Sequence, residues 1–463
     1  MTMFSGLYTA LKGLQASQRA MEVTGHNVAN ANTEGYSRQQ AVLVASDVIE
    51  VGGLKMGTGV EVEKVRRIRD AFLDMQIRSV NSKSGYWQSK QDVLQQVEVT
   101  YMEPSEKGIA SLLNNFWNSW QEVSLNPESS SVRVDLTENA ASLADAINST
   151  YSDLLALRTD INRTLETTVS QVNTISDRIA QLNEQINEGM LRNQPPNDLM
   201  DKRDLLLKDL AEIADIKAFG TADGMMDVFL GGRPLVAGSS SNKMELVVNN
   251  NDPIVKWETG PEVELNAGRV KALLDVTQEI KDDYLANLDE LALRLTEEVN
   301  KLHETGYGLD NSTGIKFFTD LSGSSMPAAA FKVNDDLIDD PNKIAAAGQT
   351  DSPGDNSNVA QIVALKDLPL THPDNNGDYT ATFNSFYTDS IARLGVKTQQ
   401  ANHMVDNSRA MLDQVVRRQE SAAGVNLDEE MANMVQFQHS YSAAAKISAT
   451  IDQMLETLLN NVG

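Results

Sequence analysis

The sequence predicts a mainly α-helical, elongated, multi-domain fold with β inserts. Three observations predict it: amphipathic helical patterns at both ends of the chain, two long apolar stripes in its middle, and short Gly-rich segments between them. We expect paired, coiled-coil-like terminal helices, a bundle of long helices and a small outer domain of β or mixed structure. A chain of 463 residues is long enough for about three domains.

The first predicted element is an N-terminal helix over residues 4–28. Large apolar residues recur there at helical spacings and form one narrow stripe: Phe4, Leu7, Leu11, Leu14, Met21 and Val28. Small residues such as Gly6 and Gly13 lie between them and would let another helix approach closely. The helix should end where residues that favour turns follow: Asn27, Asn30, Asn32, Thr33 and Gly35.

A connector and a bundle of long helices follow. Residues 31–65 are rich in Gly and β-branched residues, which indicates short strands and turns. Helical patterns then dominate from about residue 70 to 214. The clearest stripe alternates steps of four and three: Ile161, Leu165, Thr168, Val172, Ile175, Ile179, Leu182 and Ile186. We expect this stripe to pack inside the chain's own bundle rather than on a partner.

The second half alternates between β and helical patterns. Between residues 216 and 264 the apolar period approaches two, and Gly and Asn pairs supply turns, so we expect β-hairpins. A second long helix carries the stripe Tyr284, Leu288, Leu291, Leu295, Val299 and Leu302. Helical patterns return near residue 388, and a last stripe continues to the C-terminus: Leu427, Met431, Met434, Val435, Gln438, Tyr441, Ala445, Ile451, Met454, Leu455 and Leu458.

This layout predicts that the two ends of the chain pair. The expected domains are a terminal helical domain with its connector, the long-helix bundle, and an outer β or mixed insert, over residues 1–60 with 424–463, 61–305 with 388–423, and 306–387. Helices with a narrow apolar stripe gain stability on docking, so we interpret both terminal stripes as buried on assembly. In the alternative interpretation both helices close the core of a compact monomer, and periodicity alone leaves both open.

Composition excludes several classes of function. The chain has 39 Lys and Arg against 65 Asp and Glu, a formal charge of −26, which disfavours nucleic acid and anionic membranes as partners. It has no cysteine, its five histidines form no close ligand pair, and it has no phosphate loop or nucleophile elbow. We therefore expect no enzyme, metal or cofactor. The N-terminus lacks a basic start and a cleavage site, so we expect no cleaved signal peptide.

Motifs at both ends resemble one protein family. The run His26-Asn-Val-Ala-Asn-Ala-Asn-Thr-Glu-Gly-Tyr36 resembles the N-terminal signature of the bacterial flagellar rod, hook and hook-associated proteins. Residues 424–446, which begin Gly-Val-Asn-Leu-Asp-Glu-Glu, resemble the matching C-terminal signature. Residues 196–208 and 306–314 resemble hook-associated members in particular. The combination of hook-type ends with a middle of long helices also favours that branch of the family.

The resemblance implies a non-enzymatic structural subunit of the junction between the flagellar hook and filament. Such a subunit self-assembles, stacks on hook protein below and on hook-associated protein 3 above, and reaches the extracellular flagellum through the flagellar type III export system. The resemblance also implies an export chaperone that binds near the C-terminal helix. Its expected contacts are Met431, Met434, Met454 and Leu458, because methionines suit a surface that accepts two partners in turn.

The assembly interface is therefore expected on the two terminal stripes and on the turn at residues 30–36. Gly35 would supply a left-handed residue there, and Tyr36 belongs to the same motif. Alternatives stay open: the asparagines only end a helix, and the methionines are ordinary core. Arg38 and Lys446 are expected to be solvated. The competing functions are another axial subunit, such as hook or distal rod protein, and a secreted adhesin or enzyme with flagellar-type ends.

Overall fold

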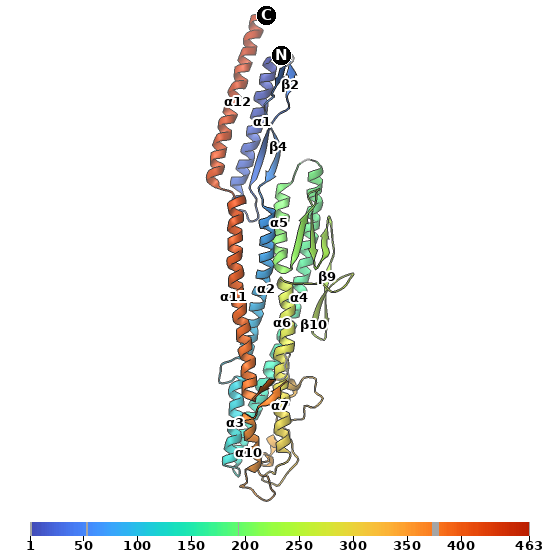
Figure 1. The fold of residues 1–463 in the computed structure, drawn as a ribbon, viewed down its shortest axis with the longest axis vertical. Helices are drawn as coiled ribbons and strands as arrows, with labels where there is room; N and C mark the ends of the chain where they lie inside the picture. The colour runs from blue at the N-terminus through green and yellow to red at the C-terminus, as the bar shows by residue number, and fades with distance from the viewer. Residues whose placement is uncertain (1, 52–53, 193, 373–378, 463) are drawn as a thin grey trace.

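The computed structural model describes residues 2–51, 54–192, 194–372 and 379–462. Its fold is mainly α with β inserts, as predicted. The molecule is elongated, with the helices α1 (Thr2–Ala29) and α12 (Leu427–Val462) side by side at one end (Figure 1). The helix α10 (Ser357–Ala364) lies at the opposite end.

The end with the terminal helices also contains β structure. Two antiparallel pairs, β1 with β4 and β2 with β3, follow α1 in the chain: β1 (Gln39–Ala45), β2 (Ile49–Val51), β3 (Leu54–Met56) and β4 (Val60–Arg67). Small residues of α1 face α12. A methyl group placed on Gly13 would lie 3.6 Å from Cβ of Ala444, and one placed on Gly6 would lie 3.2 Å from Cδ1 of Ile451. Close approach of the two helices at these glycines is thus confirmed.

Long helices form the middle of the molecule: α2 (Ala71–Tyr101), α3 (Ile109–Leu125), α4 (Ser130–Leu191), α5 (Asn197–Ile213), α6 (Arg269–Glu279), the π-helical η1 (Ile280–Leu285), α7 (Ala286–His303) and α11 (Phe383–Ala423). The helix α2 packs against α11, α5 and α6. The predicted stripe at residues 161–186 is buried on α4, except for the half-buried Leu182. It therefore packs inside the chain, as expected.

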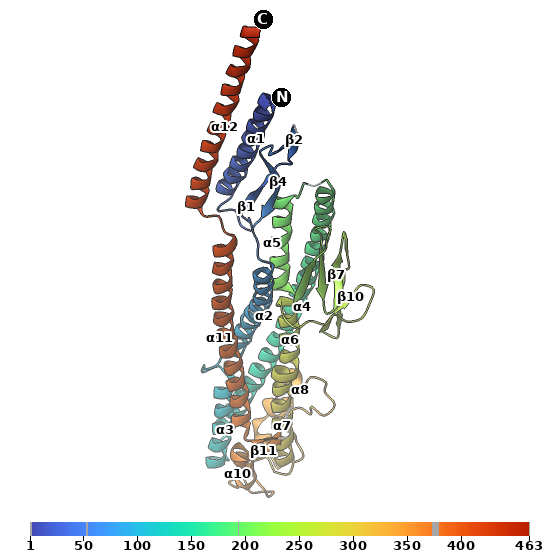
Figure 2. The same ribbon diagram turned by 45° about the horizontal axis from the view of Figure 1, so that its top comes forward.

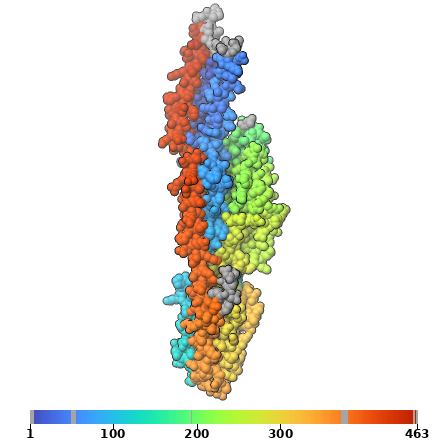
Figure 3. Space-filling model, in the orientation of Figure 1, coloured from blue at the N-terminus to red at the C-terminus, as the bar shows by residue number. Residues whose placement is uncertain are grey.

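The β-hairpins predicted near residues 216–264 are present and cover one side of α4. A four-stranded antiparallel sheet in the order β5-β6-β7-β8 stands beside a separate β9-β10 pair: β5 (Ile216–Gly220), β6 (Met226–Leu230), β7 (Arg233–Ala237), β8 (Ser240–Ser241), β9 (Met244–Asn249) and β10 (Asp252–Trp257). These strands form a lateral projection of the elongated body (Figure 3).

Short elements fill the end opposite the termini: α8 (Pro327–Ala330), α9 (Asp335–Asp339), η2 (Pro341–Lys343), η3 (Leu365–Asp367), β11 (Leu370–His372) and β12 (Tyr379–Ala381). Helix α11 begins at Phe383, before the predicted start near residue 388, because the Thr382 hydroxyl caps it by accepting from the Ser385 amide. Few aromatic residues occur in the chain, and several gather here in the core: Phe116, Trp117, Trp120, Phe317, Phe318 and Phe331. The three-domain division stays a prediction.

The junction between the bundle and the terminal helices is a short linker. Helix α11 ends at Ala423, α12 begins at Leu427, and the two helix axes diverge at this point (Figure 2). The side chain of Asn426 starts α12 by accepting from the amides of Asp428 and Glu429 at 3.0 and 3.3 Å. The first turn of α12 is therefore capped from within the linker.

Candidate assembly site at the base of the terminal helices

The large residues of α1 are only partly buried. Leu7, Leu14, Met21 and Val28 are half-buried, and Leu11 is 47% exposed. The buried face of α1 instead carries mostly small residues: Ala10, Ala16, Ser17, Ala20, Val23, Thr24 and Asn27. The predicted stripe of large residues therefore stays partly open to solvent. The side chain of Phe4 lies outside the described residues.

The predicted stripe of α12 is divided between two environments. Met434, Ala445, Ile451 and Leu455 are half-buried. The other described members are exposed: Leu427, Met431, Val435, Gln438, Tyr441 and Met454. The exposed apolar residues lie on the sides of α12 that α1 leaves uncovered. The side chain of Leu458 lies outside the described residues.

Asn27 connects α1, β1 and α12 through one fully used amide. Its Nδ2 donates to the Gln39 carbonyl at 2.8 Å and to Glu430 Oε2 at 3.0 Å. Its Oδ1 accepts from the Gln39 amide at 2.9 Å and from the Tyr36 hydroxyl at 2.8 Å. All four hydrogen-bonding positions of this side chain are occupied, and the residue is 1% exposed. Asn27 therefore does more than end a helix.

The other motif residues shape the turn that follows α1. Asn30 Nδ2 donates to the His26 carbonyl at 3.0 Å, and the Thr33 hydroxyl donates to Asn30 Oδ1 at 3.2 Å. These bonds are local caps. Gly35 has a φ of +78°, the left-handed conformation expected there. Burial, followed by nearby carboxylates, raises the pKa of Tyr36, so its hydroxyl stays protonated and donates to Asn27. Asn32 is exposed.

Arg38 is not the solvated residue that we expected. Its Nε donates to Glu430 Oε1 at 2.8 Å, and its Nη1 donates to Glu429 Oε2 at 3.0 Å. Its side chain is only 22% exposed, because the first turn of α12 covers it. Glu430 is 2% exposed, and its two oxygens bind Asn27 and Arg38. The two terminal motifs thus meet in one hydrogen-bonded cluster, whereas Lys446 is exposed as expected.

A second cluster joins the same turn to the bundle. Asp201 on α5 accepts from the Ser37 amide at 3.1 Å and from the Ser37 hydroxyl at 2.7 Å. Arg67, at the end of β4, donates to Asp201 at 2.7 Å and to Asp204 at 2.8 Å. Arg69 binds Asp204 at 2.9 Å. Our sequence analysis missed these roles, although Asp201 and Asp204 lie within the motif at 196–208.

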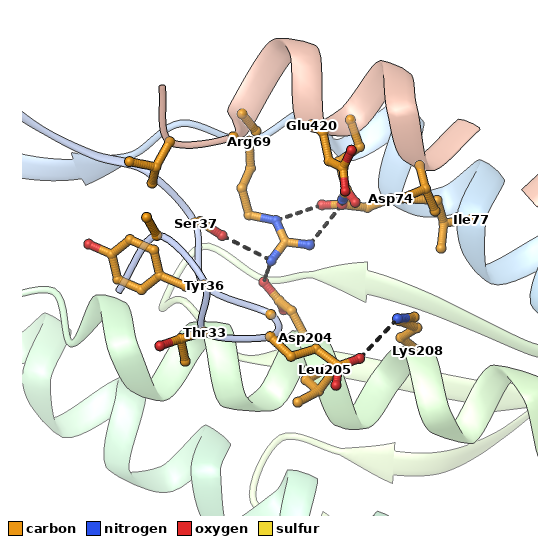
Figure 4. A pocket seen from close by; sticks show the side chains of 18 of the residues that line it. Thr33, Tyr36, Ser37, Arg69, Asp74, Ile77, Asp204, Leu205, Lys208 and Glu420 are labelled. Carbon is orange, nitrogen blue, oxygen red and sulfur yellow. Dashed lines mark hydrogen bonds and ion pairs between the residues drawn. The ribbon is translucent and has the colours of Figure 1, made fainter. Parts of the chain in front are cut away.

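A cavity of about 420 Å³ lies beside this cluster (Figure 4). Its walls come from the turn at residues 31–37, from α2 and α5, and from the end of α11 with its linker. Arg69 lies two residues after the end of β4. Its side chain extends through the site toward Asp74 and Asp204, as the dashed lines show. Gln419 of α11 donates to Asp74 at 2.5 Å. The cavity thus lies where four segments of the chain meet.

The site consists of paired charges, hydrogen-bonded amides and apolar helix faces. Among the described residues, no group of three or more His, Asp or Glu side chains could hold a metal ion. None of the described helices is long and apolar enough to cross a membrane. Paired charges, saturated amides and apolar helix faces can hold segments together and bind other helices.

Family models match three parts of the chain. The flagellar hook-associated protein FlgK helical domain matches residues 94–318, the C-terminal model of the flagellar basal body rod FlgEFG proteins matches residues 420–461, and the flagella basal body rod protein model matches residues 7–36. The two terminal matches cover most of α1 and α12, which meet at Asn27 and Glu430.

Relatives match over the full length. Flagellar hook-associated protein 1 of Bacillus subtilis is 31% identical over 99% of this chain and 98% of its own. The protein of the same name from Escherichia coli is 25% identical over 99% of this chain and 100% of its own. Among solved structures, the flagellar hook junction protein FlgK from Burkholderia pseudomallei matches with a TM-score of 0.64 and 16% identity, over 75% of this chain and 99% of that one. The last comparison shows a shared fold.

Proposed function

Since the chain belongs to the flagellar hook-associated protein 1 family and is a structural protein of the hook–filament junction, we propose that it assembles there through the open faces of its paired terminal helices. The observation that carries this proposal is the exposure of apolar side chains on α12. Six are between 38% and 54% exposed: Leu427, Met431, Val435, Tyr441, Ile447 and Met454. On α1, Tyr8 and Leu11 are 52% and 47% exposed.

Burial of these side chains would drive assembly. Apolar surface gains about 25 cal/mol for each Å² removed from water, so rows of exposed Met, Leu and Ile on two adjacent helices favour association with other helices. The contacts of Gly6 with Ile451 and of Gly13 with Ala444 leave these exposed large residues open to solvent. The exposed members of the two predicted stripes therefore keep their proposed role, and their packing partners would be other subunits.

The turn at the base of the pair would set the direction of the assembled helices. Asn27, Arg38 and Glu430 hold α1, β1 and α12 together, and Ser37 with Asp201 holds the turn on the bundle. In a regular assembly of such pairs, the angle between the terminal helices and the bundle must be the same in every subunit. These buried contacts would supply that angle in every subunit.

The partners follow from the same proposal. The subunit would contact copies of itself, hook protein on one side and hook-associated protein 3 on the other. It would leave the cell through the flagellar type III export system, and a chaperone would cover the methionine-rich face of α12 beforehand. This role requires no catalysis, metal or cofactor.

Deletion of the gene tests the proposal directly. Electron microscopy of the deletion strain should show complete hooks without filaments, and flagellin should appear in the medium. Expression of the full chain from a plasmid should restore filaments. Missing or aberrant hooks would instead place the subunit in the rod or hook, and normal filaments in the deletion strain would contradict a role at the junction.

A further inference from the structure

A cluster of paired charges lies beneath the terminal turn, next to the cavity. It brings four guanidinium groups together with three carboxylates: Arg67, Arg69, Arg78 and Arg203, and Asp74, Asp201 and Asp204. Arg67 pairs with Asp201 and Asp204, and Arg69 pairs with Asp74 and Asp204. Arg203 lies 3.5 Å from Asp204. These three arginines use all three carboxylates.

Arg78 is the cation that remains. It lies on α2 and lines the cavity, and within the described part of the chain its guanidinium has no hydrogen-bond or ion-pair partner. Burial lowers the pKa of Arg78, and the more distant Asp74 and Asp204 offset this effect only in part. A carboxylate brought to this half-buried guanidinium would form short, charge-assisted hydrogen bonds.

The cavity can admit such a group. Its volume of about 420 Å³ falls within the range of small-ligand sites, and apolar side chains line part of it: Ile77, Leu205, Val416 and Val425. Apolar walls strengthen electrostatic contacts inside, because they keep the local dielectric constant low. Lys208 lines the cavity too, and its contact with Glu34 at 3.4 Å joins two exposed side chains.

The other charges set the size of the ligand. Glu34 and the exposed Glu420 also line the cavity, so an extended polyanion would meet repulsion there. One carboxylate group matches the single unpaired guanidinium. An aspartate or glutamate side chain has this chemistry, and so does a small free carboxylate.

We infer that the cavity binds one carboxylate group from outside the chain, and that the guanidinium of Arg78 is the group that binds it. In an assembly this site would bind a neighbouring subunit, and this part of the inference rests on the proposed function. Each copy carries a formal charge of −26, so neighbouring copies repel each other. An acidic side chain of an adjacent subunit, bound at Arg78, would replace repulsion at one point by attraction.

Binding can be tested on the purified full chain, independently of the junction. Acetate, which has a single carboxylate, is the probe, and chloride replaces it at constant ionic strength in the reference. We expect acetate to raise the melting temperature of the wild type, and calorimetry should show binding at least about tenfold weaker for Arg78→Gln. Arg78→Lys should be intermediate, because it keeps the charge without the fork of donors. Arg163→Gln, on the exposed side of α4, is the matched control.

The source of the carboxylate is tested in cells that carry the same variants. Acetate binding that requires Arg78, together with detached or unstable filaments in Arg78→Gln cells, would identify an adjacent subunit as the source. The same binding with normal filaments would identify a free carboxylate. Equal acetate effects in wild type and Arg78→Gln, or none in either, would overturn the inference, and the deletion experiment on the junction would be unaffected.

Discussion

Asn27 of α1 and Glu430 of α12 are 403 residues apart in the chain and share a hydrogen bond of 3.0 Å in a site closed to solvent. The bond joins the two terminal motifs, each of which has its own family match. Neither helix can change direction without breaking it, because Asn27 also binds β1 and Glu430 also binds Arg38. The base of the terminal pair is therefore one rigid unit.

Asn27→Leu should loosen this unit. The substitution leaves the Gln39 backbone and the carboxylate of Glu430 without their partner, which should cost about 2–4 kcal/mol of local stability. Hydrogen exchange of the first turns of α12 should become faster, while exchange in α4 stays unchanged. Asn32→Ala is the control, since the Asn32 side chain is exposed. Unchanged exchange in Asn27→Leu would refute the connecting role.

Gly35→Ala should destabilise the turn. Gly35 has a φ of +78°, and a Cβ there would lie 3.3 Å from Cβ of Leu205, so we expect a loss of about 1–2 kcal/mol. Gly25→Ala is the matched comparison, because a Cβ at Gly25 meets nothing within 4 Å and the residue is helical. That variant should be up to about 1 kcal/mol more stable. Equal melting temperatures of both variants would contradict this account.

Periodicity predicted most of the fold. The stripe on α4 has few polar entries and one buried side, so steps of three and four identify it directly. The same rule placed the stripes on α1 and α12, but it could not show which face of α1 meets α12. Glycine and alanine have little hydropathy, and the close packing of Gly13 on Ala444 depends on shape.

The charged part of the site could not be predicted from local patterns. Arginine usually lies on the surface. Arg38 is covered by α12 only because the fold brings Glu430 next to Asn27 and Arg38. Likewise, Asp201 gains its role from Ser37, which lies 164 residues away. The resemblance to family motifs identified these segments as important but did not show which residues pair with each other. Long-range contacts between charged residues produce no periodic pattern in the sequence.

His303 should make the stability of the end opposite the termini depend on pH. Its Nε2 accepts from the Ala345 amide at 3.0 Å, so its Nδ1 carries the proton and donates to the Ile315 carbonyl at 2.6 Å. Burial lowers the pKa of His303 from 6.5 to about 4. Between pH 4 and pH 6.5, His303 is therefore mostly protonated in the unfolded chain and mostly neutral in the folded chain.

The expected effect has a definite sign. The contribution of His303 is fully present above about pH 6.5 and is lost as the pH falls toward 4, by about 3 kcal/mol in total. Denaturant unfolding at several pH values should show a smaller loss in His303→Gln than in the wild type. Parallel pH profiles of the two proteins would contradict a neutral buried imidazole.

Met454→Asp should separate assembly from folding. Met454 is 51% exposed on α12, so a carboxylate at this position stays hydrated in the free chain and should change its melting temperature little. In the proposed assembly the same charge would enter an apolar contact between helices, where burial costs several kcal/mol. We therefore expect the purified variant to fold normally and cells that carry it to lose their filaments.

The choice of position makes this test clean. Leu455→Asp and Met434→Asp should also block assembly, but both residues are half-buried beside α1, so these variants would weaken the terminal pair as well. Gln453→Asp adds the same charge at an exposed polar neighbour and is the matched control. Filament loss in Met454→Asp with filaments retained in Gln453→Asp would locate the interface on the apolar side of α12. Normal filaments in Met454→Asp would exclude this side, because a folded subunit would then be assembling with a charge in the proposed contact.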